Sequence, residues 1–338
     1  MIYSIFCYSD SGSVLAEKLC GLLGLGLECV HSTAKFADRY GFTAHESISR
    51  DMDVLFRESD ALVFIGAAGI AVRTIAPYIV SKVSDPAVIV IDDRGRFVIS
   101  LLSGHIGGAN GIAKNIADLI GAEAVVTTAT DGAGRFSCDA WASAHGCAIS
   151  SMKIAKDVSA AILTHDIPVS SEYDIPEQLP AGLVKGSDGE LGIYIGIKKE
   201  EPYEETLRLI PRIVTLGIGC RRGVSSDEIM NAVRSVLGDR DIDIRTVCRI
   251  VSIDVKKDEE GLLEAAEKLG ADTEFYTAEE LNAVPGEFEE SEFVKKTVGT
   301  GNVCERAAAL AGGKIIIKKT AMTGVTVAAS IKDWRTEF

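Results

Sequence analysis

A glycine-rich segment with a single histidine is the part of this chain best suited to chemistry. It reads Leu-Leu-Ser-Gly-His-Ile-Gly-Gly-Ala-Asn over residues 101–110, where the pattern predicts the end of a strand and the start of a helix. The free N–H groups and the positive dipole end of a helix N-terminus attract a carboxylate, a phosphate or a developing oxyanion. His105 can move a proton near neutral pH beside that point. A glycine turn made for close packing, with His105 as a hydrogen-bond partner, explains the segment equally well.

A second junction of this kind lies at Gly66-Ala67-Ala68-Gly69, with Arg73 on the second turn of the predicted helix. The patterns GxGxxG and GxxxxGK[ST] are absent, so a nucleotide role has little support. A carboxylate-binding junction and plain helix packing remain as alternatives.

Polar residues also surround the strands that follow. Lys82 and Asp85 precede the apolar run 87–91, and a solvated loop is the usual explanation for such charges. Asp92-Asp93-Arg94-Gly95 separates this run from the next apolar run, 97–101, and predicts the turn of a hairpin.

A cluster of hydroxyls and one carboxylate ends the next predicted strand. It reads Thr-Thr-Ala-Thr-Asp over residues 127–131 and includes Thr128 and Asp131. Ligands bind outside the carboxyl ends of strands in open α/β sheets. Asp131 can orient His105, act on water or cap the following segment, and the sequence leaves these roles open.

Two adjacent arginines mark a strand-to-helix turn near the end of the chain. Arg221 and Arg222 stand in Gly-Ile-Gly-Cys-Arg-Arg-Gly, residues 217–223. Guanidinium groups bind carboxylates bidentately. Cys220 has neighbours that lower a thiol pKa, but the sequence shows no base partner, so a buried or incidental cysteine is the better interpretation. Lys256 and Lys257 add cations after another strand, where a solvated face competes as an explanation.

The elements that must position these residues alternate between strands and helices. This alternation predicts two three-layer α/β domains joined by a smaller α/β middle domain. We place the N-terminal α/β domain at 1–131, the middle domain or linker at 132–210 and the C-terminal α/β domain at 211–338.

Composition excludes several classes of protein. The net charge of −14 argues against nucleic-acid binding, and an acidic ligand would need a local cluster of arginine and lysine. The eight cysteines are scattered without a CxxC pair, which argues against a metal site or a disulfide framework and predicts a reducing cytoplasm. The start lacks a basic secretory n-region, and the longest apolar stretch, 61–72, falls short of the ~20 residues of a membrane span.

Taken together, the motifs resemble the cobalt-precorrin-5A hydrolase family. LLSGHIGGAN, GIAVR with IAP, KxxDPAV followed by DDxG, and TTATD are similar to its N-terminal region. LGIGCRRG, IDVKKDEEGL and GxGNVCExAAxL are similar to its C-terminal region, whereas 132–210 matches only weakly by motif. The resemblance implies that water opens the ring-A δ-lactone of cobalt-precorrin-5A and that acetaldehyde leaves, giving cobalt-precorrin-5B.

The resemblance also implies roles for the candidate residues. His105 would be a general base or proton shuttle, and Asp131 would orient it or water. The substrate, a small cobalt corrinoid rich in carboxylates, would contact ten further residues: Arg73, Lys82, Ser103, Gly104, Gly107, Gly108, Asn110, Thr128, Arg221 and Arg222.

This chemistry requires no metal site or cofactor of the protein, because cobalt arrives inside the substrate. We expect no nucleic-acid or membrane partner, and the sequence leaves a homodimer open. A non-catalytic protein that binds and transfers corrinoid intermediates is the alternative function, because the C-terminal region resembles a small stand-alone protein of the aerobic pathway. A phosphate- or nucleotide-using α/β enzyme is a second rival, which the missing nucleotide motifs disfavour.

Overall fold

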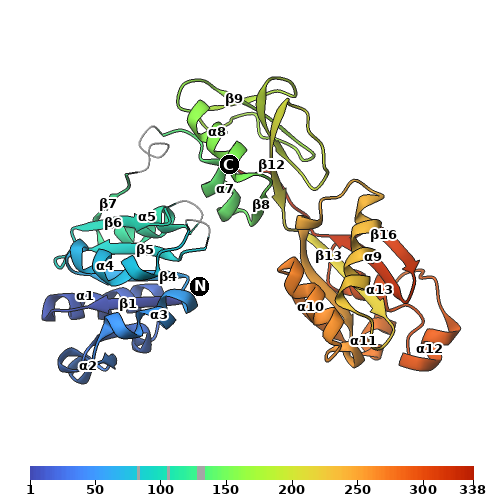
Figure 1. Ribbon diagram of the computed structural model, residues 1–338, viewed down its shortest axis with the longest axis horizontal. Coiled ribbons are helices and arrows are strands. Elements are labelled where there is room, and N and C mark those ends of the chain that lie inside the picture. Colours follow the sequence, from blue (N-terminus) through green and yellow to red (C-terminus); the bar gives the residue numbers. More distant parts are fainter. Residues whose placement is uncertain (82–83, 105–106, 128–133) are drawn as a thin grey trace. The chain divides into compact units, whose positions relative to one another are not determined.

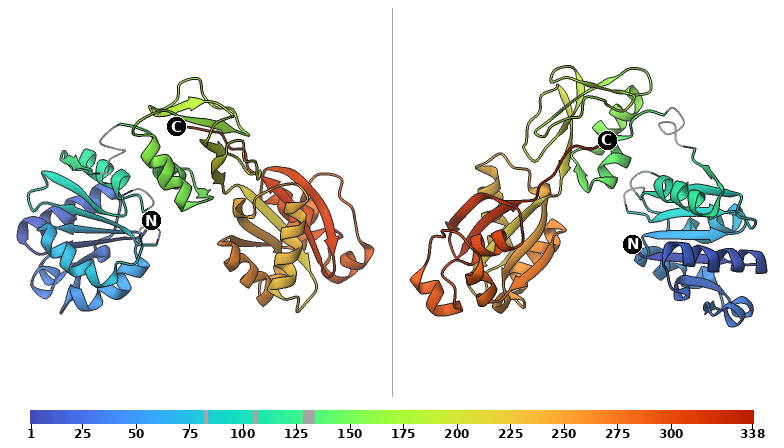
Figure 2. Two further views of the ribbon diagram at one scale, coloured as in Figure 1. Left: turned by 45° about the horizontal axis from the view of Figure 1, so that its top comes forward. Right: turned by 180° about the vertical axis from the view of Figure 1, so that it is seen from behind.

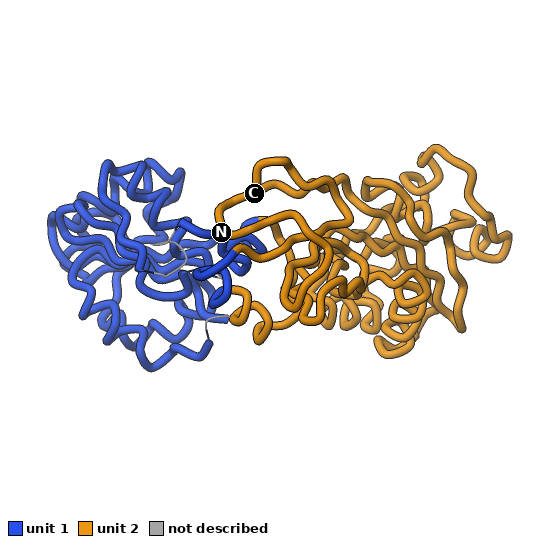
Figure 3. The backbone as a smooth tube through the Cα atoms, turned by 90° about the horizontal axis from the view of Figure 1, so that it is seen from above, with its two compact units in different colours: residues 1–144, 159–165 blue, residues 145–158, 166–338 orange. Residues whose placement is uncertain are grey.

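The computed structural model describes residues 1–81, 84–104, 107–127 and 134–338. Lys82, His105, Thr128 and Asp131 lie outside this set. The chain divides into two compact units, residues 1–144 with 159–165 and residues 145–158 with 166–338 (Figure 3). Its strands form three separate sheets (Figure 1). The domain boundaries at residues 131 and 210 stay a prediction.

The N-terminal unit holds a seven-stranded sheet in the order β3-β2-β1-β4-β5-β6-β7. Its strands are β1 (Tyr3–Cys7), β2 (Val30–Thr33), β3 (Thr43–His45), β4 (Ala61–Ile65), β5 (Ala87–Ile91), β6 (Phe97–Leu102) and β7 (Glu123–Val125). Strands β1 to β5 are parallel, but β6 runs antiparallel to β5, and β7 is parallel to β6. The carboxyl ends of β6 and β7 therefore lie at the edge of the sheet where β4 and β5 begin.

Helices cover both faces of this sheet (Figure 2). They are α1 (Asp10–Leu23), η1 (Leu27–Cys29), α2 (Ala34–Tyr40), α3 (Ile48–Glu58), α4 (Ala68–Ile75), η2 (Ala76–Tyr78) and α5 (Ala109–Ile120). The next described helix, α7 (Cys138–Ala144), instead contacts α8 (Met152–Ala161), where Cys138 Sγ lies 3.7 Å from Ser159 Oγ. Strands β4 and β5 are fully buried apolar runs, as strands covered on both faces must be. One apolar core packs β4 and β5 against α1 and α5, and another packs the opposite face against α3 and α4. The predicted three-layer arrangement is confirmed here.

The middle of the chain forms a five-stranded sheet in the order β10-β9-β11-β12-β8. The elements are β8 (Cys147–Ile149), α8 (Met152–Ala161), β9 (Ile167–Ser171), β10 (Leu183–Lys185), β11 (Leu191–Ile195) and β12 (Glu205–Pro211). Four of the strands are parallel, and β8 pairs antiparallel with β12. This is the smaller α/β part that the sequence predicts.

The last part is a five-stranded sheet in the order β15-β14-β13-β17-β16. Its strands are β13 (Val214–Cys220), β14 (Val247–Ile253), β15 (Asp272–Tyr276), β16 (Lys314–Met322) and β17 (Val325–Ile331). Its helices are α9 (Ser226–Gly238), η3 (Ile244–Thr246), η4 (Asp254–Lys256), α10 (Glu260–Leu269), α11 (Ala278–Ala283), α12 (Glu292–Val298) and α13 (Val303–Leu310). Helices α9 and α10 pack on one face, and α11 and α13 pack on the other, so this sheet is also three-layered.

A buried carboxylate joins the middle and last sheets within the second unit. Asp243 accepts hydrogen bonds from Arg208 Nη1 at 2.8 Å and from Arg245 Nη2 at 2.7 Å. Arg245 Nη1 also donates to the carbonyl oxygen of Ser150 in the middle part, at 3.1 Å. Burial opposes the charge of Asp243, but the hydrogen bonds and charges of the two arginines prevail and lower its pKa to about 2.

No helix among the described residues combines the length and the apolar character that a membrane span requires.

Candidate functional site

The loop between β6 and α5 is folded back onto the first turn of the helix. The N–H of Ala109 donates to the carbonyl oxygen of Ser103 at 3.1 Å, and the N–H of Asn110 donates to that of Gly104 at 2.9 Å. Ser103 has a φ of 56°, which side-chain-bearing residues rarely adopt. Such strain is often found at functional sites, where the surrounding structure holds it in place.

Glycine is a steric requirement at two positions of this loop. A Cβ on Gly107 would lie 2.5 Å from the Cβ of Ser103, 3.0 Å from the carbonyl oxygen of Ser103 and 3.3 Å from that of Asp85. A Cβ on Gly104 would lie 2.7 Å from Oδ1 of Asn110. Gly108 differs from both, because a Cβ there would meet open space and only its φ of 79° requires glycine. The close packing expected for this glycine turn is therefore present.

Two polar side chains are buried where this loop meets α5. Asn110 is buried, and its Oδ1 accepts a hydrogen bond from Ser100 Oγ at 2.6 Å. Ser103 is 9% exposed, and its hydroxyl finds no hydrogen-bond partner among the described residues. A buried hydroxyl without a partner costs about 1–3 kcal/mol, which calls for an explanation such as a ligand.

Asp85 lies against this loop and is a residue that the sequence reasoning placed in a solvated segment. It is only 6% exposed, and its carboxylate accepts hydrogen bonds from the N–H groups of Val80 and Ser81, all at 3.1 Å. Its carbonyl oxygen is one of the atoms that exclude a side chain at Gly107. The aspartate just before Pro86 and a buried strand was the available signal, because a carboxylate there can cap the turn that leads into the strand.

The structure does not bring the Gly66–Gly69 junction to the edge of the sheet where Ser103 lies. Gly66 follows the carboxyl end of β4, whereas Ser103 follows β6, which runs in the opposite direction. These two glycine junctions therefore lie at opposite edges of the sheet. Arg73 on α4 is exposed, and its Nη1 would be 3.4 Å from a Cβ on Gly69, so its guanidinium folds back along the helix toward that junction.

The predicted hairpin turn is confirmed, and it has an additional role. Asp92 caps the turn by accepting the N–H groups of Arg96 at 2.6 Å and Phe97 at 2.7 Å. Asp93 instead accepts hydrogen bonds from the hydroxyls of Ser9 and Ser11 at the start of α1. This carboxylate is thus held at the edge of the sheet away from Ser103.

The arginine-bearing turn of the last sheet is exposed. The N–H of Arg221 donates to the carbonyl oxygen of Gly324 at 2.9 Å, and that of Gly223 donates to Glu259 Oε1 at 2.6 Å. Lys256 is 9% exposed and pairs with Glu259 Oε2 at 3.0 Å, so this lysine belongs to an internal ion pair and not to a solvated face. Burial raises the pKa of the Cys220 thiol, which therefore lacks the acidity of a nucleophile.

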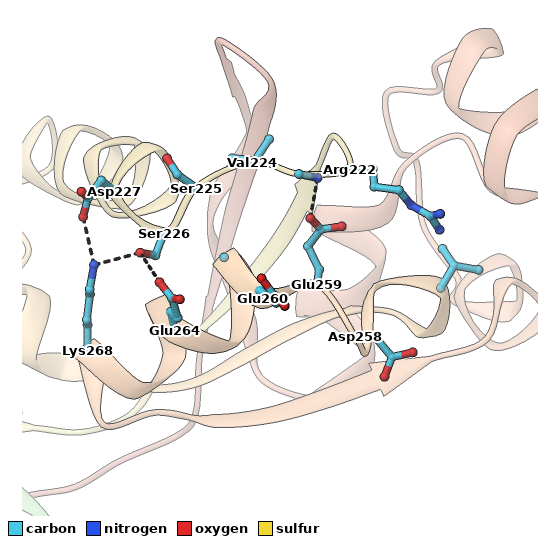
Figure 4. Close-up of a pocket in the computed structure, with 13 residues that line it drawn as sticks. Arg222, Val224, Ser225, Ser226, Asp227, Asp258, Glu259, Glu260, Glu264 and Lys268 are labelled. Atoms are coloured by element: carbon cyan, nitrogen blue, oxygen red, sulfur yellow. Dashed lines mark hydrogen bonds and ion pairs between the residues drawn. The ribbon is translucent and has the colours of Figure 1, made fainter.

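Arg222 lies at the rim of a surface pocket of about 850 Å³ between the starts of α9 and α10 (Figure 4). Lys268 on its far side pairs with Asp227 at 2.9 Å and donates to Ser226 Oγ at 2.8 Å. The pocket's charged residues are Arg222, Lys268, Asp227, Asp258, Glu259, Glu260 and Glu264. Carboxylates outnumber cations in it, so the pocket by itself repels a ligand that carries several carboxylates.

A pair of histidines in the N-terminal unit was not foreseen. Nδ1 of His31 on β2 lies 2.9 Å from Nε2 of His45 on β3, and Nδ1 of His45 lies 2.7 Å from Oδ2 of Asp51 on α3. Burial, together with the neighbouring His45, lowers the pKa of His31 to about 4. Within the described ranges, no group of three or more His, Cys, Asp or Glu side chains is arranged to hold a metal ion.

Of the predicted site residues, the structure gathers Ser103, Gly104, Gly107 and Gly108 in the loop between β6 and α5, and Asn110 in the first turn of α5. It places Arg73 on α4 and Arg221 and Arg222 in the second unit. Lys82, His105, Thr128 and Asp131 lie outside the described residues, so their contacts stay predictions.

Comparisons with known proteins cover nearly the whole chain. The family model "Cobalamin synthesis G N-terminal" matches residues 51–131, and "Cobalamin synthesis G C-terminus" matches residues 214–330. "Cobalt-precorrin-5A hydrolase" of Salmonella typhimurium is 33% identical over 344 residues, 97% of this chain and 97% of that protein. The protein of the same name from Priestia megaterium is 33% identical over 300 residues, 81% of this chain and 79% of its own. A crystal structure titled as a putative cobalamin biosynthesis protein G homolog from Sulfolobus solfataricus covers 98% of this chain and 97% of that one, with 23% identity and a TM-score of 0.39.

Proposed function

The chain belongs to the cobalt-precorrin-5A hydrolase family, and we propose that it opens the ring-A δ-lactone of cobalt-precorrin-5A with release of acetaldehyde. The product is cobalt-precorrin-5B, in anaerobic cobalamin biosynthesis. One observation carries this proposal: a relative named for that activity is 33% identical over 97% of the chain. The match spans 97% of this chain and 97% of that relative, so it is not confined to one shared domain.

The loop after β6 supplies the chemistry in this proposal. Attack of water on the lactone carbonyl creates an oxyanion, which needs hydrogen-bond donors placed in advance. The backbone at Gly107 and Gly108, at the start of α5, and the unpaired hydroxyl of Ser103 are such donors. His105 accepts the proton of water or passes it on, and Asp131 orients His105 or the water itself.

The remaining residues hold the substrate. Gly104 and Asn110 shape the loop, and the cations bind peripheral carboxylates of the corrin precursor. The substrate-binding residues in this proposal are Arg73, Lys82, Ser103, Gly104, Gly107, Gly108, Asn110, Thr128, Arg221 and Arg222.

Cobalt enters as part of the substrate, and the reaction needs no cofactor of the protein. We place the enzyme in the cytoplasm, where it acts on a small molecule without a nucleic-acid or membrane partner, and the proposal allows a homodimer. Release of an aldehyde distinguishes the proposed hydrolase from the alternative, a non-catalytic corrinoid carrier. The names of the relatives do not favour this alternative.

The test is anaerobic incubation of the purified protein with cobalt-precorrin-5A, followed by aldehyde trapping and mass spectrometry of the corrinoid. We expect one acetaldehyde for each lactone opened. His105→Ala should abolish aldehyde release and retain binding of the corrinoid, whereas His165→Ala, at an exposed histidine at the end of the 159–165 segment, should change neither. Binding of the corrinoid by the unmodified protein without any aldehyde would favour the carrier and reject the hydrolase.

A further inference from the structure

Two of the eight cysteines lie with their sulfur atoms 3.9 Å apart. Cys20 is buried near the end of α1, and Cys29 is the last residue of η1 and partly exposed. The other thiols with a described contact lie against oxygen atoms, as Cys7 does with Ser13 Oγ at 3.6 Å. We propose that Cys20 and Cys29 form a redox site, which a hydroperoxide converts to an intramolecular disulfide. This inference does not rest on the proposed function.

The backbone between the two residues brings them together in a tight turn. Gly24 ends α1 with a φ of 68°, and its N–H donates to the carbonyl oxygen of Cys20. The N–H of Leu25 donates to the same carbonyl oxygen at 2.9 Å. A disulfide bond is ~2.05 Å long, so the sulfur atoms must approach each other by ~2 Å, which rotation about the two Cα–Cβ bonds can supply without opening the turn.

The two thiols differ in the way that this chemistry requires. The hydrogen bond from Cys20 is the largest influence on Cys29 and lowers its pKa, against the effects of burial and of the Glu28 carboxylate. The same hydrogen bond, followed by burial, raises the pKa of Cys20. Cys29 is also partly exposed whereas Cys20 is buried, so a peroxide reaches Cys29 first. Cys29 is therefore the nucleophile and Cys20 the resolving thiol, because the exposed thiolate is the reactive form.

The reaction balances with one hydroperoxide per pair. The Cys29 thiolate attacks the outer peroxide oxygen, the O–O bond breaks, and an alcohol leaves with a proton while Cys29 becomes a sulfenic acid. The Cys20 sulfur then attacks the Cys29 sulfur, the S–O bond breaks, and water leaves as the S–S bond forms. Two thiols are oxidised by two electrons, and the peroxide is reduced to an alcohol and water.

The test uses tert-butyl hydroperoxide, alkylation of the unfolded protein and peptide mass spectrometry. After oxidation we expect six alkylated cysteines of the eight in the chain, and a disulfide that links the peptides of Cys20 and Cys29. Cys29→Ser should retain seven free thiols, and Cys20→Ser should accumulate a sulfenic acid at Cys29 that dimedone traps. Cys248→Ser is the matched control, since Cys248 is also partly exposed but contacts the Val214 carbonyl oxygen at 3.5 Å; this variant should form the disulfide at the normal rate.

Charge and stability give two further readouts. Glu28→Gln removes the anion next to Cys29, so the disulfide should form several-fold faster. The disulfide closes a short loop, and its expected effect is a melting temperature about 5 °C higher, lost in Cys29→Ser. Equal alkylation of all eight thiols after peroxide, or a disulfide that does not link Cys20 to Cys29, would overturn the proposal. Sulfinic acid at Cys29 beside an unmodified Cys20 would also overturn it.

Discussion

Replacing Gly107 by alanine should displace the loop that carries Ser103. Carbon atoms pack best ~3.5–4.0 Å apart, and the new Cβ would lie 2.5 Å from the Cβ of Ser103. Ser103 must therefore move by ~1 Å, and the carbonyl oxygens of Ser103 and Asp85, at 3.0 and 3.3 Å, leave the new methyl group little room to move instead. Overpacking of this kind costs about 2 kcal/mol, and a shift of ~1 Å in a catalytic group lowers kcat about 100-fold.

Alanine substitutions at two neighbouring glycines distinguish a steric displacement of the loop from the cost of backbone strain. A Cβ on Gly108 meets nothing within 4 Å, so Gly108→Ala should cost only about 1 kcal/mol through its φ of 79°. Gly111→Ala, in the first turn of α5 and also without a neighbour within 4 Å, should stabilise the fold by about 0.5 kcal/mol. Thermal unfolding and the rate of aldehyde release are measured for all three variants. Full kcat in Gly107→Ala, with a loss of stability no greater than in Gly108→Ala, would refute the argument.

Three other substitutions follow from the contacts. Ser103→Gly removes the hydroxyl but relieves the strain of a φ of 56°, so it should lower kcat while it raises the melting temperature. Ser103→Ala should lower kcat without raising the melting temperature, and an unchanged kcat in both variants would show that the hydroxyl has no role in the reaction. The pKa of His31 is about 4 in the folded protein, below its value in the unfolded chain, so its contribution to the free energy of unfolding is present above pH ~6.5 and is lost, by up to ~3 kcal/mol, as pH falls toward 4. Urea titrations should show that His31→Asn makes the free energy of unfolding less dependent on pH in this range and that His165→Asn does not. Asp243→Asn removes the buried counter-charge of Arg208, which keeps only the exposed Glu201 carboxylate at 3.9 Å, and should cost about 3 kcal/mol at neutral pH. This difference should shrink below pH ~4, as Asp243 of the unmodified protein protonates toward its pKa of about 2; a constant difference would contradict this.

Much of the fold was predictable because its signals are local. The apolar runs 87–91 and 97–101 are strands as expected, and the turn signal at residues 92–95 joins β5 to β6. The helix predicted to start within residues 101–110 begins at Ala109, because Gly107 and Gly108 form the closed loop in front of it. Strands β2 and β3 have four and three residues, too few for an apolar pattern, so the contact of His31 with His45 had no signal in the sequence.

Burial of charge was the least predictable feature. Asp85 and Lys256 look like ordinary solvated residues in sequence, because a partner a few residues away does not show whether the contact is buried. Asp85 is satisfied by backbone N–H groups four and five residues before it, and Lys256 by Glu259, three residues after it. Only the fold decides whether such a short-range contact lies in solvent or under a neighbouring element.

The reversal of one strand determines where the candidate site lies. In a fully parallel sheet, the loop after β6 would share an edge with Gly66 and Asp93, at the carboxyl ends of β4 and β5, where ligands of open α/β sheets usually bind. Because β6 runs antiparallel to β5, this loop instead lies beside Asp85, at the edge where β5 begins. Strand β7 is parallel to β6, so the segment that follows it starts from the same edge. The motifs around Ser103 and Asp85 and the end of β7 are separated in sequence, and this single reversal is the physical reason why all three lie at the same edge of the sheet.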